Sequence, residues 1–532
     1  MKEIRELKFE ELTTKQKLGI VHTPLIHEAI EPDKIDYIIE RIKERAIGIV
    51  WVQWKNSQKY RPFFDGVISR IREAADYPIV IITDAESGIG DYLVGQHSAI
   101  GATDSEKHAY AFGKATAIGL RERGYDMVCH PVLDARDSGW TRGYSDDKYK
   151  ITRLAKAETQ GLHDGGILTM AKHYPSAKYD VEVDTHMTEA SCSETEKELL
   201  SAGLYPYLEL IREGLLDGIM AGHEKLKNID PDAPASMSKK CIDIIRRQGF
   251  DGLMMTDALD MMGIRETYGR VGCVGVALEA GEDAPLYYDL EPEITQNAFY
   301  ECYEKGIISD AELDRAVKNI LALQHKAYLY RKPKCTELTE EEISLVKSIN
   351  RDSIFAVLDE GTPLSLNPNG KYYFALMVKN EYAQGTQNGL VVDTFSGGWR
   401  SPAKIINKIN ELFPNSLVDT FFEFPTPQNG HKILSRSLDY DEVIFITFSE
   451  FSAYVGPERL SHRVVALIDA MQNKGRIGTL IHNGNPKVTE ELAHIPRRIY
   501  GGRSAEASLA VFDVLSGKIG ANGKPNYKLN LK

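Results

Sequence analysis

The sequence predicts an α/β protein in which an N-terminal (β/α)8 TIM-like barrel precedes a second α/β domain. Short apolar runs alternate with amphipathic helical stretches from about residue 15 to 330, and several runs end in reactive side chains. No glycine-rich phosphate turn follows the first run. The alternation is typical of parallel β/α units, and the lack of that turn favours a barrel over an open doubly wound sheet.

The predicted barrel strands are apolar runs separated by helical stretches. They lie at 46–54, 77–85, 125–135, 165–174, 216–223, 250–258 and 273–281. A representative helix is predicted over 193–214, where Ser193 is the candidate N-cap and leucines recur at helical spacing. Barrel chemistry is found at the C-terminal ends of strands, so polar side chains there are the candidate site residues.

The composition of the sequence changes near the end of the predicted barrel. Residues 327–350 are charged and partly helical, which indicates a connector between domains. We therefore expect a barrel at 1–330, a linker at 331–349 and a C-terminal domain at 350–532. Apolar runs alternate with helical stretches in this last part, which predicts another α/β unit; the runs are 371–379, 390–395, 442–450, 475–486 and 497–502.

Composition excludes several classes of partner. The net charge of −13 comes from mixed acidic and basic residues rather than charge blocks, so neither a nucleic acid nor an anionic membrane is an expected partner. Six scattered cysteines form no CxxC pair and are expected to be buried thiols. The first 20 residues are charged where a signal peptide needs an apolar run, and no membrane-spanning stretch is present. We expect a cytoplasmic protein.

Three predicted strands end in residues that could perform catalysis. Lys172 and His173 end one run, His223 ends the next, and Asp257 ends the third. Asp257, flanked by Thr256 and Asp260, could act as a nucleophile, a metal ligand or a helix cap. An acid, a base and a nucleophile are therefore all available at this edge of the predicted sheet.

A polar loop and two further strand ends add candidates. Asp184 and His186 lie two residues apart, so in an extended segment both side chains point to the same face, and the carboxylate can orient the imidazole. Asp84 and Glu86 end an earlier run, and Arg142 lies in a loop. Each of these three could hydrogen-bond a polyol or could be structural.

A metallohydrolase barrel is the competing interpretation. Its strand-end lysine, histidine and aspartate have counterparts in Lys172, His223 and Asp257. That site also needs a His-x-His pair on the first strand, and no such pair occurs here. We therefore expect no metal ion in this site.

The order of the motifs resembles glycoside hydrolase family 3. In chain order they read IITDAESG, VLDARDSGWTRGYSDD, MAKHYP, DTH, IMAGH, DPDAPASMS, IIRRQGFDGLMMTDALDM and ALEAGEDAPL. The resemblance continues through SIFAVLDEGTPLSL and the segment 499–530, and it implies that the second domain is a C-terminal α/β sandwich. It covers nearly the whole chain.

The resemblance also implies roles for the candidate residues. Asp257 corresponds to the nucleophile that forms a covalent glycosyl-enzyme with retention of configuration. In the β-N-acetylglucosaminidase branch an Asp-x-His dyad supplies the general acid/base, and its counterparts are Asp184 and His186. The residues expected to bind the substrate are Asp84, Arg142, Lys172, His173 and His223. No cofactor is implied.

Three positions depart from the family pattern. Ser87 replaces a glycine, Tyr92 occupies the place of a sugar-binding arginine, and Ser176 replaces another glycine. One sugar contact is therefore expected to be missing, and the acid/base loop is expected to suit a different aglycone or a modified sugar.

These observations predict a retaining exo-β-glycosidase acting on an oligosaccharide or small glycoside, with terminal β-N-acetylhexosaminides as the first choice. The alternatives are a β-glucosidase or xylosidase-like hydrolase, a β-N-acetylglucosaminide phosphorylase, and a sugar-binding protein that has lost catalysis. If the dyad is only structural, the proton donor would be an acid of the second domain such as Glu450 or Glu458. The sequence leaves open whether the protein forms a homodimer.

Overall fold

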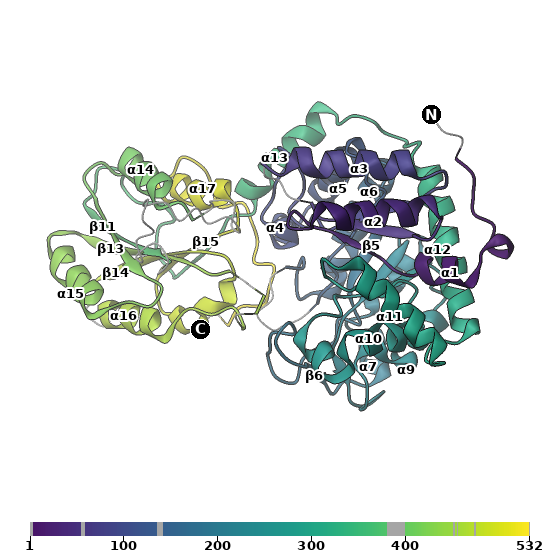
Figure 1. The fold of residues 1–532 in the computed structure, drawn as a ribbon. Helices are drawn as coiled ribbons and strands as arrows, with labels where there is room; N and C mark the ends of the chain where they lie inside the picture. The colour runs from purple at the N-terminus through teal and green to yellow at the C-terminus, as the bar shows by residue number, and fades with distance from the viewer. Residues whose placement is uncertain are drawn as a thin grey trace.

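The computed structural model describes residues 4–54, 59–135, 142–379, 400–450, 453–454, 456–472 and 475–530. The first domain is a curled parallel sheet surrounded by helices (Figure 1). Over these residues the strand order is β1-β2-β3-β4-β5-β7-β9, so neighbours along the chain are neighbours in the sheet. That order confirms the TIM-like arrangement of the first domain.

The strands are short and buried, as in the packed interior of a barrel. They are β1 Leu25–Ile26, β2 Ile49–Val52, β3 Val80–Thr83, β4 Met127–Val128, β5 Leu168–Tyr174, β7 Gly218–Ala221 and β9 Leu253–Thr256. Where an eighth strand is expected, a single parallel bridge joins Met255 to Ala284. A small separate sheet pairs β6 Ser191–Cys192 with β8 Lys225–Leu226.

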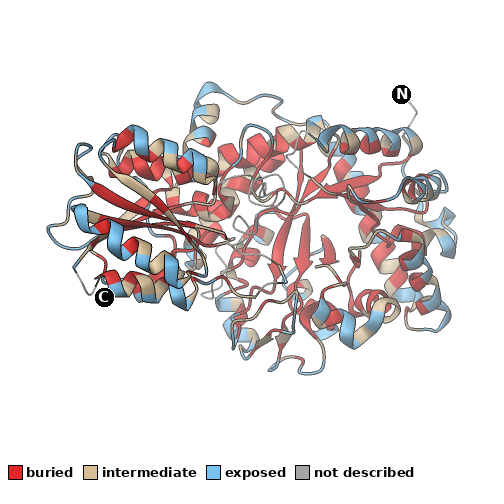
Figure 2. Ribbon diagram, turned by 60° about the vertical axis from the view of Figure 1, so that its left-hand side comes forward, coloured by how far each residue is buried: buried red, intermediate tan, exposed pale blue. Residues whose placement is uncertain are grey.

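Amphipathic helices cover the outside of this sheet, with buried faces turned inward (Figure 2). In α2 (Pro32–Lys43), Ile35, Ile38, Ile39 and Ile42 are buried at the spacing that one helical face requires. The other helices here are α1 Thr14–Ile20, α3 Arg61–Ala74, α4 Gln96–Thr103, α5 Glu106–Glu122, α6 Lys148–Asp164, α7 Glu196–Ser201, α8 Tyr205–Arg212, α9 Lys239–Arg247, α10 Met262–Ala280, α11 Pro292–Glu304 and α12 Asp310–Tyr330. Short 3-10 helices lie at Phe9–Glu11 and Ala235–Met237.

Two local predictions are wrong. The run 273–281 is not a strand but the end of α10, which stops at Gly281 with φ 114°. A short apolar run buried on a helix resembles a buried strand, and periodicity alone cannot separate them. The predicted helix at 193–214 is two helices, and Thr195, not Ser193, caps the first through a capping box with Glu198.

The second domain is a six-stranded sheet over the described residues, in the order β10-β15-β14-β13-β11-β12. Only β10 is antiparallel to its neighbour. The strands are β10 Phe355–Leu358, β11 Tyr372–Val378, β12 Leu417–Phe422, β13 Glu442–Phe448, β14 Ile477–Asn483 and β15 Arg497–Gly501. The predicted runs did not include β10 or β12, and the run 390–395 lies outside the described residues.

Helices cover both faces of this second sheet, with α14 and α17 on one side and α15 and α16 on the other (Figure 1). Their bounds are α14 Pro402–Leu412, α15 Pro427–Arg436, α16 His462–Gln472 and α17 Ala505–Leu515, with 3-10 helices at Ser437–Asp439 and Pro486–Leu492. The layers confirm the predicted C-terminal α/β sandwich.

The two domains are joined by specific contacts. Helix α13 (Glu340–Asp352) packs between α5 and α17. Its Asn350 side chain accepts a hydrogen bond from the Gly95 amide at 3.0 Å and donates to the Leu93 carbonyl at 2.8 Å and to Glu506 at 3.2 Å. The end of the chain returns to the barrel, where the Tyr527 hydroxyl donates to the Gly143 carbonyl at 2.6 Å.

The six cysteines are free thiols, five of them buried, and Cys335 is half-buried. None of the helices in the described part of the chain is long and apolar enough to cross a membrane.

Candidate active site

Asp257 directly follows β9, and its backbone position is fixed by a 2.7 Å hydrogen bond from its amide to the Ala221 carbonyl of the adjacent strand. One carboxylate oxygen accepts the Ala258 amide at 2.7 Å, and the other lies 3.9 Å from Nε2 of His173. Burial raises the pKa of Asp257, but the nearby His173 and His223 outweigh it and lower the pKa to about 2. The carboxylate is therefore ionised at neutral pH, as a nucleophile must be.

A charged cluster forms the neighbouring wall of the site. The Lys172 ammonium at the end of β5 lies 2.8 Å from Asp84 and 2.7 Å from Glu86. Arg142 holds the other side of Glu86 through two contacts, one of them at 3.0 Å. Burial alone would raise the pKa of Glu86, but Arg142 and Lys172 keep it well below its ordinary value. Glu86 is thus the anion that fixes both cations in place.

Asp84 is the most accessible member of this charged cluster. Its side chain is 41% exposed, and its Oδ1 has no hydrogen-bond partner among the described residues. Because Oδ1 itself is buried, the accessible part of this carboxylate is the Oδ2 side, where Lys172 anchors it and a hydroxyl could be bound as well.

His173 is oriented by Asp134, a residue that the sequence reasoning missed. Asp134 accepts the His173 backbone amide at 3.1 Å and its Nδ1 at 2.9 Å, which turns Nε2 toward Asp257. The signal was its place at the end of the predicted run 125–135, where strand-end polar residues are expected.

Asp184 and His186 form the dyad that their spacing predicts. Asp184 Oδ1 accepts both the backbone amide of His186 at 3.0 Å and its Nδ1 at 2.9 Å. Burial raises the pKa of Asp184, but these two bonds and the Gly456 amide lower it overall. Asp184 therefore stays a carboxylate that holds the imidazole by Nδ1, so that Nε2 is the ring nitrogen farther from it.

Three contacts hold the dyad near Asp257. The His186 carbonyl accepts the amide of Met262 at 3.1 Å, five residues after Asp257. From the second domain, the Gly456 amide donates to the other Asp184 oxygen at 3.2 Å. The Tyr454 ring meets that of His186 edge-on at 5.3 Å. The second domain thus supports the loop that carries the dyad.

His223 fixes the turn after Asp257. Its Nε2 donates to the Ala258 carbonyl at 3.0 Å, and its Nδ1 lies 2.7 Å from the Ser236 hydroxyl. Burial is the largest influence on His223 and lowers the pKa of its ring. Both ring nitrogens are engaged within the protein, so the geometry suits a supporting role; its predicted substrate contact stays a prediction.

The two alternative acids of the second domain are bound to cations. Glu450 lies 3.3 Å from Lys379 and 3.1 Å from Arg400. Glu458 is buried against Arg503 and accepts the Asn485 amide at 3.3 Å. Both carboxylates are thus engaged in ion pairs within the second domain.

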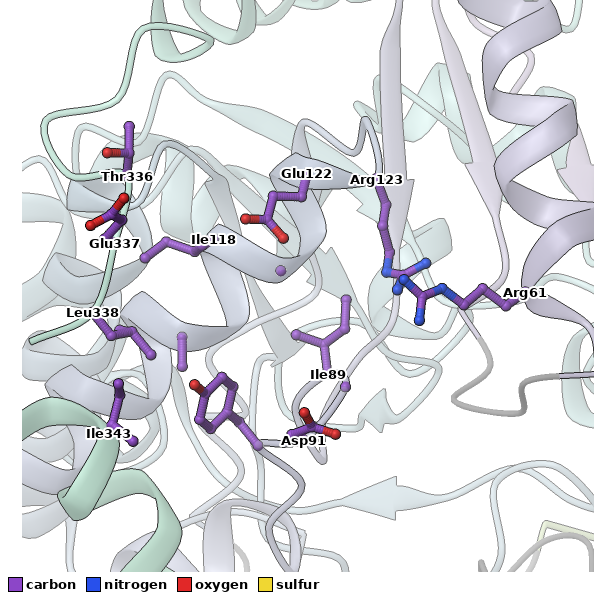
Figure 3. A pocket seen from close by; sticks show the side chains of 14 residues that line it. Arg61, Ile89, Asp91, Ile118, Glu122, Arg123, Thr336, Glu337, Leu338 and Ile343 are labelled. Carbon is purple, nitrogen blue, oxygen red and sulfur yellow. The ribbon is translucent and has the colours of Figure 1, made fainter. Parts of the chain in front are cut away.

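The three departures have structural consequences. Tyr92 lines a cavity of about 400 Å³ between α5 and the linker, together with Ile89 and Asp91 (Figure 3), rather than joining the charged cluster. Ser176 keeps a left-handed φ of 56°, which a glycine adopts easily, and its hydroxyl accepts the Ala135 amide at 2.9 Å. The Ser87 carbonyl accepts the Val94 amide at 2.9 Å, closing the loop behind Glu86.

The barrel thus presents an ionised carboxylate, that of Asp257, together with an aspartate–histidine dyad beside its strand ends. The Glycosyl hydrolase family 3 N terminal domain matches residues 14–323, more than half of the chain. The chain therefore belongs to glycosyl hydrolase family 3, and its substrate is a carbohydrate.

Named relatives agree with this membership. The β-hexosaminidase of Xylella fastidiosa (strain M23) is 32% identical over 245 residues, which cover 43% of this chain and 72% of the relative. That of Tolumonas auensis is 28% identical over 260 residues, covering 46% and 77%.

Solved structures share the whole fold. A family 3 β-N-acetylglucosaminidase from Paenibacillus sp. str. FPU-7 superposes with a TM-score of 0.80 at 22% identity, covering 98% of this chain and 100% of that one. The β-glucoside phosphorylase BglX gives 0.78 at 22% identity, covering 98% and 95%. At these identities the likeness concerns the fold.

Proposed function

We propose that this protein is a retaining exo-β-glycosidase that removes terminal β-linked N-acetylhexosamine residues through a covalent sugar ester on Asp257. The observation that carries the proposal is the Asp184–His186 dyad, with Oδ1 and Nδ1 2.9 Å apart, docked against the segment that follows Asp257. The names of the hexosaminidase relatives support the choice of sugar.

In the first step, the ionised Asp257 attacks the anomeric carbon while His186 donates a proton from Nε2 to the departing glycosidic oxygen. An imidazole with an ordinary pKa of about 6.5 can exchange this proton near neutral pH. Asp184 stabilises the imidazolium and fixes the ring by Nδ1. In the second step, His186 takes a proton from the incoming acceptor, which attacks the same carbon and frees Asp257.

The charged cluster would bind the terminal sugar. Asp84 offers an acceptor oxygen, and Lys172 and Arg142 offer donors held in place by Glu86. His173 lies between this cluster and the nucleophile, close enough to contact the sugar beside its reacting carbon.

Phosphorolysis is the second candidate function. A neutral imidazole repels an incoming phosphate less than a carboxylate base would, so phosphate can replace water in the second step. The phosphorylase among the structural neighbours shows that the fold accommodates this chemistry in another protein. A β-glucosidase-like arrangement would need Glu450 or Glu458 as its acid, and the cations beside both disfavour it.

A panel of aryl β-glycosides, assayed with and without inorganic phosphate, tests these functions together. We expect turnover of the N-acetylglucosaminide above that of the glucoside and xyloside. Asp257→Ala should lower kcat/KM by at least about 10⁴-fold, because the covalent path is lost. If the product is a glycosyl phosphate, the enzyme is a phosphorylase and not a hydrolase.

Two controls separate the remaining arrangements. Asp260→Asn changes a neighbouring carboxyl that accepts the Tyr288 amide at 3.1 Å and should keep most activity. If His186→Ala leaves kcat/KM on an alkyl glycoside unchanged, the dyad is not the acid/base and the proposal fails.

A further inference from the structure

A second cluster of polar side chains is buried in the barrel wall, outside the site described above. His97 on α4, His130 just after β4 and Glu158 on α6 are 0% exposed. Glu158 Oε1 lies 3.1 Å from His97 Nε2 and 2.8 Å from His130 Nδ1. Three separate elements thus deliver two imidazoles and a carboxylate to one point.

Glu158 differs from several other buried carboxylates of this chain in having no basic side chain beside it, although Asp184 is likewise held by a histidine. Among the residues that the structure describes, its contacts are His97, His130 and the Tyr144 hydroxyl, with no lysine or arginine. Four other buried carboxylates each touch a lysine or arginine; they are Asp126, Asp217, Asp283 and Glu458. A buried anion needs a counter-charge, and here the protein does not supply a permanent one.

The two imidazoles are also incompletely used. His97 Nδ1 and His130 Nε2 are buried and have no hydrogen-bond partner within the described structure. These are the ring nitrogens that do not contact Glu158, so the ligand set consists of the other two, His97 Nε2 and His130 Nδ1.

We propose that His97, His130 and Glu158 bind a divalent transition-metal ion of the Zn²⁺ type, forming a structural site separate from the sugar site. Two imidazole nitrogens and one carboxylate oxygen are ligands that zinc accepts, with bond lengths of about 2.0–2.2 Å. Ligand atoms of a tetrahedral site at that distance are roughly 3.4 Å apart, so the observed separations of 2.8 and 3.1 Å would widen by a few tenths of an ångström when an ion binds between them. The ion provides the missing positive charge.

The surroundings show what such an ion would stabilise. The Tyr144 hydroxyl donates to the second oxygen of Glu158 at 2.5 Å and so orients the carboxylate. The Tyr144 carbonyl accepts Nδ2 of Asn526 at 3.1 Å, and the preceding Gly143 accepts the Tyr527 hydroxyl. The metal would thus fasten α4 and α6 under the loop that carries Arg142.

The test is the metal content of the full chain, purified without a polyhistidine tag and dialysed into metal-free buffer. We expect about one Zn²⁺ per chain by mass spectrometry of the elements, loss of thermal stability after strong chelation, and recovery on adding Zn²⁺. Co²⁺ added to the chelated protein should give visible absorption bands of a bound ion.

Variants locate the ion. Glu158→Gln and His130→Gln should each lose the metal, while His163→Gln should keep it, because His163 forms a buried pair with Asp217 at 2.8 Å that Lys326 already neutralises. The proposal is overturned if the unmodified protein carries no stoichiometric metal and neither Zn²⁺ nor Co²⁺ changes its melting temperature or absorption; the cluster is then a hydrogen-bond network with an imidazolium. Retention of the metal in both ligand variants would overturn the assignment equally. Because metal content and melting temperature need no sugar, failure here leaves the glycosidase proposal untouched.

Discussion

At the scale of single residues, the site separates two acid–base tasks by environment. Asp257 is surrounded by imidazoles, which keep it ionised, whereas Asp260 three residues later has a pKa raised by burial. His186 is held by an anion and is therefore suited to carry a proton. The proposed nucleophile and the proposed proton carrier thus have distinct neighbours.

The depressed pKa of Asp257 predicts the pH dependence of covalent labelling. The folded-state value is about 2, below the ordinary 3.8, so the carboxylate is charged, and its contribution to stability is present, above about pH 4 and lost only as the pH falls through 2. An activated fluorosugar needs the nucleophile but little help from an acid. We expect its inactivation rate to stay nearly constant from about pH 7 down to about pH 4, measured by residual activity.

Intact-mass analysis and peptide mapping of the labelled protein provide the control, and the label should be found on Asp257. An inactivation rate that halves above about pH 4, in protein whose circular dichroism is unchanged, would contradict the depressed pKa.

At the scale of secondary-structure elements, the sequence predicts which residues end a strand better than it predicts which side chains pair with them. Lys172, His173 and Asp257 could be found because parallel strands deliver their last residues to the same edge of a barrel. Glu86 and Asp134 could not be assigned their roles, because pairing with Lys172 and His173 depends on how neighbouring strands lie in space. At the position of the eighth barrel strand the described structure has a single bridge at Ala284. The sequence there has no apolar run of strand length, so the strand could not be predicted.

The loop that carries the dyad gives a prediction for Asp184. Asp184→Asn should lower kcat/KM by about 10²-fold on an alkyl glycoside and by less than about 10-fold on a dinitrophenyl glycoside, whose leaving group needs little protonation. The reason is that an amide holds the ring of His186 without stabilising its charge. Steady-state kinetics on both substrates measure the difference.

Asp180→Asn is the matched control on the same loop. Asp180 pairs with Lys227 at 2.9 Å and accepts Ser193, away from the dyad, so kinetics close to those of the unmodified protein are expected. Equal losses on both substrates for Asp184→Asn would instead indicate a misplaced loop.

At the scale of the whole molecule, the second domain completes the site rather than merely following it. The Gly456 amide reaches Asp184, and the Tyr527 hydroxyl reaches the loop beside Arg142. Such contacts are beyond local sequence patterns, because their partners are more than 270 residues apart in the chain. Because α13 packs against helices of both domains, we expect it to influence the site by fixing the position of one domain on the other.

Asn350 on that helix is the best point at which to test the coupling. It is 4% exposed and bridges the barrel loop at Leu93 and Gly95 to Glu506 of α17. Asn350→Ala leaves buried polar groups without partners and should lower the free energy of unfolding by about 2 to 3 kcal/mol in denaturant titrations. Asn415→Ala, which removes a single exposed bond to the Asn369 carbonyl, should cost less than about 1 kcal/mol. If Asn350→Ala unfolds at the same denaturant concentration as the Asn415 variant, the bridge does not couple the domains, and the seating must depend on the apolar contacts of α13 alone.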